Sequence, residues 1–125
     1  MNKITLVTGL WDIKRSELTE GWNRSFEDHY LAKFKDLLKL DQINLIVFGD
    51  KDLESFVYDI RSKENCQFIV RDQEWFKGEL FDKIQEIRNK PEWYNQAGWL
   101  PESTQAKLEM YNPLVMSKMF LLNDA

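Results

Sequence analysis

The sequence predicts an α/β fold with a parallel sheet and helices on both of its faces. Three short apolar runs, at residues 3–9, 43–49 and 67–70, have the composition of buried strands. Segments with helical spacing alternate with these runs, and this order requires right-handed crossovers between parallel strands. Two of the runs lack clear polar–apolar alternation, so we expect a three-layer fold, with strand order 3-2-1 or with strand one in the centre.

Helices are expected between and after these strands. Apolar residues recur at helical spacing over residues 26–38, and Ser25 is placed to cap this first helix. The same spacing predicts a short helix over residues 53–60. A third helix is expected over residues 76–87, and Pro91 is expected to end it.

The C-terminal segment is also predicted to be helical. Residues 101–103 are typical of a helix start, and Asn112 is placed as the N-cap of a further helix with Pro113 at its first position. The apolar residues expected to face inward from this helix are Val115, Met119 and Leu122. The sheet pattern calls for another strand after it. We therefore expect residues 1–125 to form a single, incomplete α/β domain whose apolar edge favours self-association.

Composition and charge exclude several classes of protein. The 125 residues are 43% hydrophobic and 30% charged, which is typical of one globular domain. The net charge of −4 gives no basic field, so nucleic acid is not expected as a partner. One cysteine and one histidine exclude a disulfide framework and a multi-histidine metal site. No apolar run approaches the roughly 18 residues of a membrane span, and no signal peptide is evident. We expect a cytoplasmic protein, peripheral at the inner membrane at most.

Aromatic residues are the unusual feature of the composition, with five Trp, four Tyr and eight Phe. Trp11, Trp22, Trp93 and Trp99 fall in segments that do not have the periodicity of core elements. Such residues most often cover the edge of a core, but they also serve as anchors for partners. The alternative function is therefore a non-catalytic α/β module that binds a protein or glycan partner through its aromatic loops.

A ligand is expected at the carboxyl ends of the strands, where open α/β sheets bind their ligands. These ends are residues 8–12, 49–52 and 71–73, and they contain neither a dinucleotide fingerprint nor a phosphate-binding glycine loop. Side chains must then hold any nucleotide. The basic pair Lys14-Arg15 and Arg24 follow the first strand and can neutralise a diphosphate, although a solvated loop face explains them equally well.

The tripeptide from Asp50 to Asp52 has two interpretations. Two carboxylates after a strand suit Mg²⁺ or Mn²⁺, as in the D-x-D motif of many glycosyltransferases. More simply, Asp50 caps the helix over residues 53–60 and Asp52 favours its dipole. Because Asp50 directly follows the strand, we expect it to contribute more to ligand binding than Asp52. Lys118 interrupts an apolar set, so it is either paired or extends to solvent from the edge of its helix.

Four segments of the chain resemble a known family. They are residues 4–13 (ITLVTGLWDI), 24–27 (RSFE), 47–50 (VFGD) and 103–118 (STQAKLEMYNPLVMSK), and the order of residues in the last is not dictated by helical periodicity. On these segments the sequence is similar to the HtrL/YibB family, also called WlaTC/HtrL. This bacterial group is classed as glycosyltransferase-like and is associated with surface-polysaccharide genes. The resemblance covers essentially the whole chain but only the first half of the family's domain.

The resemblance implies the nucleotide-binding half of a GT-A-like glycosyltransferase domain. Its ligand would be a nucleotide-sugar donor, and the acceptor a glycan or a lipid-linked sugar. The metal-binding D-x-D of GT-A domains lies on a later strand. A divalent metal, Mg²⁺ or Mn²⁺, is therefore expected for the complete domain and not for this chain alone. No catalytic residue is assigned, and we expect no transferase activity from the chain by itself.

The same analogy implies four nucleotide-binding residues. Thr8, Asp12 and Asp50 match strand-end positions near the base and the ribose of the nucleotide. Lys118 matches a basic residue on the helix before the metal strand. The analogy also argues that the tripeptide from Asp50 is not the metal motif.

Overall fold

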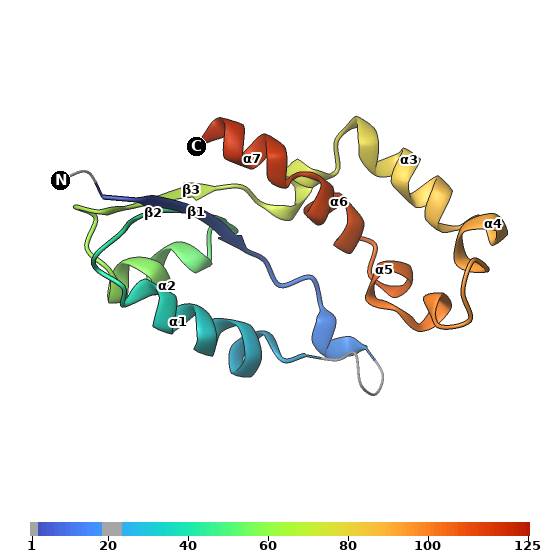
Figure 1. Cartoon of the computed structure of the whole chain (residues 1–125), viewed down its shortest axis with the longest axis horizontal. Coiled ribbons are helices and arrows are strands. Elements are labelled where there is room, and N and C mark those ends of the chain that lie inside the picture. The colour runs from blue at the N-terminus through green and yellow to red at the C-terminus, as the bar shows by residue number, and fades with distance from the viewer. Residues whose placement is uncertain (1–2, 19–23) are drawn as a thin grey trace.

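The computed structural model describes residues 3–18 and 24–125 of the chain. Its strands are β1 (Thr5–Leu10), β2 (Asn44–Gly49) and β3 (Cys66–Val70), which pair side by side in one sheet (Figure 1). All of the pairing in this sheet is parallel. The predicted parallel α/β fold is therefore confirmed for the described residues.

The strand order is β1-β2-β3, which confirms the expected order 3-2-1 and places β2, not the first strand, in the centre. Leu10 pairs with Gly49, and Gly49 pairs with Val70. Because of this register, the three strands end at the same edge of the sheet. The segments that follow them start from that edge.

Helices and helical turns form most of the rest of the described chain. They are η1 (Arg15–Glu17), η2 (Phe26–Leu31), α1 (Ala32–Leu38), α2 (Leu53–Ile60), η3 (Gln73–Phe76), α3 (Glu79–Arg88), α4 (Pro91–Tyr94), η4 (Leu100–Glu102), α5 (Thr104–Lys107), α6 (Tyr111–Met116) and α7 (Lys118–Asp124). In the part of the chain that is described, no helix is long and apolar enough to cross a membrane.

The central strand β2 is buried on both faces. Leu45 and Val47 pack into a cluster with α1 and α2, whereas Ile46 and Phe48 pack into a second cluster with residues of η3, α6 and α7. The alternation follows from the strand geometry, because consecutive side chains point to opposite faces. Figure 1 shows α1 and α2 on one side of the sheet and α7 on the other. Around the sheet the fold therefore has the three layers that the sequence predicts.

Burial on both faces was also expected for β1, and this expectation is wrong for its start. Ile4, just before β1, is 76% exposed and Leu6 is 38% exposed. The reason is the position of β1 at the edge of the sheet, with a neighbouring strand on one side only. Self-association through this edge stays a prediction.

The helix boundaries differ from the expected ones in several places. Ser25 caps the first helix as expected, since its Oγ accepts a hydrogen bond from the Asp28 amide at 3.1 Å, but the first turns are π-helical. Phe76 lies in the separate turn η3, before α3. Pro91 begins α4 and does not end α3, because proline suits the first position of a helix.

The C-terminal helix was expected to turn Val115, Met119 and Leu122 inward, and this is wrong. These side chains are 41%, 77% and 59% exposed, whereas Leu121 is buried. The residues that α6 and α7 turn toward the sheet are instead Leu114 and Leu121, which pack in the cluster around Phe48. The chain turns at Ser117 between the two helices.

Asn112 does not cap a helix either. The helix α6 already begins at Tyr111, and the Asn112 side chain instead donates a hydrogen bond to the Gln105 carbonyl at 3.2 Å. Asn112 therefore ties α6 back to α5.

Arg61 is a buried cation that connects α2 to the segment between α1 and β2. Its side chain is almost fully buried, and its guanidinium donates hydrogen bonds to the backbone carbonyls of Leu38, Leu40 and Ile43. Carbonyl groups at the C-terminus of a helix carry partial negative charge, which favours a cation there. Arg61 therefore holds the end of α1 and the entry to β2 in place.

We predict that Arg61→Met lowers the free energy of unfolding by about 3 kcal/mol, because buried carbonyls lose charged donors. Urea denaturation followed by circular dichroism measures the change. Lys35→Ala, an exposed position on α1, is the control and should change the stability by less than about 0.5 kcal/mol. Equal stabilities of Arg61→Met and the control would show that the guanidinium does not hold these segments.

Candidate functional site

The segments that follow the three strands are tied together at the carboxyl edge of the sheet. The Gln73 amide donates to Asp50 Oδ1 at 3.1 Å, and its side-chain nitrogen donates to Asp50 Oδ2 at 3.3 Å and to the Asp12 carbonyl at 2.9 Å. The indole Nε1 of Trp11 donates to the Arg71 carbonyl at 2.7 Å. These bonds fix the ends of β1, β2 and β3 relative to one another.

Trp11 lies across this edge and packs on Gly9. A Cβ atom added at Gly9 would lie 2.5 Å from Cζ3 of the Trp11 ring, so only glycine leaves room for the indole. On its other side the indole meets the Phe76 ring edge to face, with 4.9 Å between the ring centroids. Trp11 is therefore a fixed wall and not an exposed loop residue.

A tight turn after Trp11 brings two arginines together. Asp12 Oδ1 accepts a hydrogen bond from the Lys14 amide at 2.9 Å, and Lys14 has a left-handed backbone with φ of 67°. The chain then enters η1, and the Arg24 amide donates to the Arg15 carbonyl at 3.3 Å. This backbone contact places Arg15 and Arg24 beside each other after β1.

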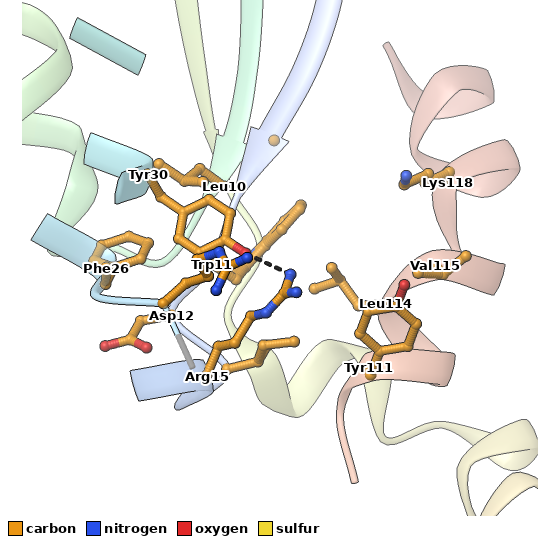
Figure 2. A pocket seen from close by; sticks show the side chains of 13 residues that line it. Leu10, Trp11, Asp12, Arg15, Phe26, Tyr30, Tyr111, Leu114, Val115 and Lys118 are labelled. Atoms are coloured by element: carbon orange, nitrogen blue, oxygen red, sulfur yellow. Dashed lines mark hydrogen bonds between the residues drawn. The ribbon is translucent and has the colours of Figure 1, made fainter. Parts of the chain in front are cut away.

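The first cavity at this edge, which we call the cationic cavity, has a volume of about 220 Å³. Arg15, Arg24 and Lys118 line it, together with the aromatic rings of Trp11, Phe26, Tyr30 and Tyr111. Figure 2 shows Arg15 reaching toward Tyr30 on one side, whereas Lys118 points back toward the same hollow from α7 on the other. Arg15 Nη1 donates to the Tyr30 hydroxyl at 2.7 Å, which orients the guanidinium.

Asp12 is the acid among the described residues that line the cationic cavity. Its Oδ2 lies 3.9 Å from Lys14 Nζ. Arg15, Arg24 and Lys118 contribute positive charge to the same lining. Arginine and lysine side chains of this kind form charge-assisted hydrogen bonds with phosphate oxygens.

The second cavity, the apolar cavity, adjoins the first and has a volume of about 450 Å³. Thr8 lines it, with Phe48, Leu121 and Leu122 among its apolar walls. It shares several lining residues with the cationic cavity, namely Gly9, Trp11, Leu114 and Lys118. A ligand that spans both cavities would have its charged part and its apolar part on either side of Trp11.

The third cavity, the acidic cavity, has a volume of about 440 Å³ and lies on the other side of Asp12. Its charged lining residues are Asp12, Lys14, Glu27, Asp50 and Asp52. The expected nucleotide-binding residues are thus divided among the cavities. Thr8 and Lys118 line the apolar cavity, Lys118 and Asp12 line the cationic cavity, and Asp12 and Asp50 line the acidic cavity. No described cavity is lined by all four residues.

Asp50 does not cap α2 with its side chain, which corrects the simpler interpretation of this residue. Both of its carboxylate oxygens accept hydrogen bonds from Gln73, and the Leu53 amide bonds to the Asp50 backbone carbonyl at 3.0 Å. Asp50 therefore joins the end of β2 to the segment after β3. Its expected contribution to ligand binding stays a prediction.

The residues present do not suit a divalent metal at this edge. Within the described ranges, no group of three or more His, Cys, Asp or Glu side chains is arranged to hold a metal ion. Asp50, the first acid of the D-x-D tripeptide, already accepts from Gln73 through both oxygens.

His29 responds to the positive charge that surrounds the cationic cavity. Burial and the charges of Lys33, Arg24 and Arg15 lower the pKa of His29 below its ordinary value, so the imidazole is neutral at pH 7. Its ring packs edge to face on Tyr30, with 4.8 Å between the centroids. His29 therefore contacts Tyr30, which lines the cationic cavity, but His29 does not itself line that cavity.

Sequence reasoning found the two arginines and Lys118 but missed the aromatic and phenolic walls. Phe26 and Tyr30 fall within the first predicted helix, over residues 26–38, and neither they nor Tyr111 were proposed to line a site. One signal for Tyr30 was available: a phenol with a polar tip on an otherwise apolar helix face needs a hydrogen-bond partner.

Comparison with known proteins gives one match. The family model described as "Bacterial protein of unknown function (HtrL_YibB)" matches residues 2–125, which is essentially the whole chain. No curated protein and no solved structure matches the chain.

We predict that Gly9→Ala displaces the Trp11 indole and lowers the free energy of unfolding by roughly 1–3 kcal/mol, because the added methyl group overpacks a fixed ring. Tryptophan fluorescence and thermal melting measure the two effects. Gly98→Ala is the matched control, since a Cβ there meets no atom within 4 Å. If both variants melt and fluoresce like the native chain, the indole is not held against Gly9.

Proposed function

Since the chain belongs to the HtrL_YibB family, a family of unknown function, we propose a function from its resemblance and from the cavities at the carboxyl edge. The chain is the nucleotide-sugar-binding part of a glycosyltransferase-like protein of bacterial surface-polysaccharide synthesis. It has a GT-A-like topology, with the donor bound at the ends of the strands.

One observation carries this proposal: Arg15, Arg24 and Lys118 line the same cavity at the carboxyl edge of a parallel sheet. Open α/β sheets bind their ligands at this edge. Charge-assisted hydrogen bonds from arginine and lysine are the usual means of holding phosphate groups. A nucleoside diphosphate linked to a sugar supplies the matching charge.

The adjoining apolar cavity can hold the base of the nucleotide. Its walls include Trp11, whose indole suits a planar base, and the hydroxyl of Thr8 can form a hydrogen bond with the edge of that base. Lys118 lines both cavities and would lie between the base and the diphosphate. In the transfer reaction the diphosphate is the leaving group, and the cations favour its developing negative charge.

The alternative function, a module that binds a protein or glycan through aromatic residues, has its own supporting observation. Trp99 is 59% exposed and Trp75 is 40% exposed, although Trp11 is packed in the edge of the sheet. Trp93 is half-buried, and Trp22 lies outside the described residues. An exposed tryptophan is a common anchor for a partner.

We predict that UDP or GDP binds the chain and that Lys118→Ala raises the dissociation constant about ten-fold or more, because a charged hydrogen bond is lost. Isothermal titration calorimetry measures both. Lys83→Ala is the control, because Lys83 is an exposed lysine of α3 whose partner is Glu86.

Equal binding by Lys118→Ala and native chains would remove the cationic cavity as the site. If neither nucleotide binds and the chain instead binds a glycan in a way that Trp99→Ala abolishes, the alternative function is correct.

A further inference from the structure

We propose that the cationic cavity binds the diphosphate group through the side chains of Arg15, Arg24 and Lys118 and needs no divalent metal ion to do so. The inference deepens the proposed function, since it specifies how the same site holds the charged part of its ligand.

Most of the acidic side chains at this edge line a different cavity from the three basic ones. A metal that bridges protein carboxylates to a diphosphate needs both on the same side of the site. Here Asp50 and Asp52 line the acidic cavity, whereas Arg15, Arg24 and Lys118 line the cationic cavity. Asp12 lines both, and among the described residues it is the acid that lines the cationic cavity. One carboxylate among these residues offers too few oxygen ligands to hold a divalent ion there.

The three cations that line the cationic cavity come from separate elements of the chain. Arg15 comes from η1, Arg24 from the segment before η2, and Lys118 from the start of α7. The backbone bond from Arg24 to Arg15 places these two residues side by side, and the bond from Arg15 to the Tyr30 hydroxyl orients the Arg15 guanidinium. Figure 2 shows Lys118 on the opposite wall. Such an arrangement surrounds an anion, with a positive group on each side.

The volume of the cationic cavity suits a diphosphate better than a whole nucleotide-sugar. The cationic cavity, at about 220 Å³, is smaller than the roughly 300–1,000 Å³ typical of pockets for whole small molecules. A diphosphate is a compact part of a nucleotide-sugar. The shared wall of Trp11 and Lys118 lets the remainder of the ligand continue into the apolar cavity.

Tyr30 adds a neutral donor to the cations. Its hydroxyl oxygen accepts from Arg15 Nη1 at 2.7 Å, so the hydroxyl proton stays available to a phosphate oxygen. The Tyr30 ring also contacts His29, whose protonation depends on the charges of Arg15 and Arg24. An anion seated in the cavity would oppose those charges and raise the pKa of His29. The chain has one histidine, so its NMR titration is directly assignable.

The test uses inorganic pyrophosphate as the probe, titrated into the full chain by calorimetry in buffer with EDTA and again with Mg²⁺ or Mn²⁺. We expect saturable binding in EDTA, with affinity that changes less than about three-fold when metal is present. Arg15→Gln and Lys118→Gln should each weaken binding about ten-fold or more. Lys33→Gln is the matched control, since it removes a nearby charge that does not line the cavity.

His29 gives a second measurement that a purely structural role of these cations would not affect. Saturating pyrophosphate should raise the pKa of His29 in the native chain, and Lys118→Gln should reduce that increase. Lys118 is exposed on its helix, so this variant tests the proposal even if Arg15→Gln fails to fold.

The outcomes separate this inference from the proposed function. Binding of pyrophosphate and of UDP or GDP only in the presence of metal would overturn the inference and leave the proposed function in place. Pyrophosphate binding in EDTA without any binding of UDP or GDP would support the inference and contradict the nucleotide site. If pyrophosphate does not bind under either condition, or binds all of the variants equally, the cationic cavity is not a diphosphate site.

Discussion

The burial of β2 on both faces is the constraint from which the rest of this structure follows. Leu45 and Val47 need one layer of helices and Ile46 and Phe48 need another, so the connections must cross over both faces of the sheet. Crossover connections make neighbouring strands parallel. Parallel strands in register end together, and three chain segments with unlike charges are thereby brought to one edge.

What distinguishes this edge is the partition of charge across it. Asp12 lines both the cationic and the acidic cavity, whereas Trp11 lines the cationic and the apolar cavity. Trp11 is held by Gly9, Phe76 and the Arg71 carbonyl, and the backbone at Asp12 accepts from Gln73. The same contacts that stabilise the fold therefore keep cations on one side and carboxylates on the other. That partition is the physical basis of the proposed diphosphate site.

The sequence was sufficient for the features that depend on local signals. Strand composition predicted β1, β2 and β3, with the observed order as one of two alternatives, and the Ser25 cap follows from a single side chain. The position of Arg15 and Arg24 after the first strand made a role in binding a diphosphate possible, beside a solvated loop face, and the structure places both in the lining of the cationic cavity.

The features that were missed depend on contacts between distant segments. Asp50 accepts from Gln73, 23 residues away, and a helix cap was the better local explanation. The burial of Leu121 in place of Met119 depends on how α7 packs on Phe48 and is not visible in the apolar spacing alone.

The central claim is that the cationic and apolar cavities together bind a nucleoside diphosphate, and amide and indole NMR shifts on addition of UDP or GDP test it most directly. The account predicts shifts of the Trp11 indole and of amides around Arg15, Tyr30 and Lys118, with the Trp99 indole unchanged. Shifts confined to the Trp99 indole and the residues around it, or no shifts at saturating nucleotide, would contradict it.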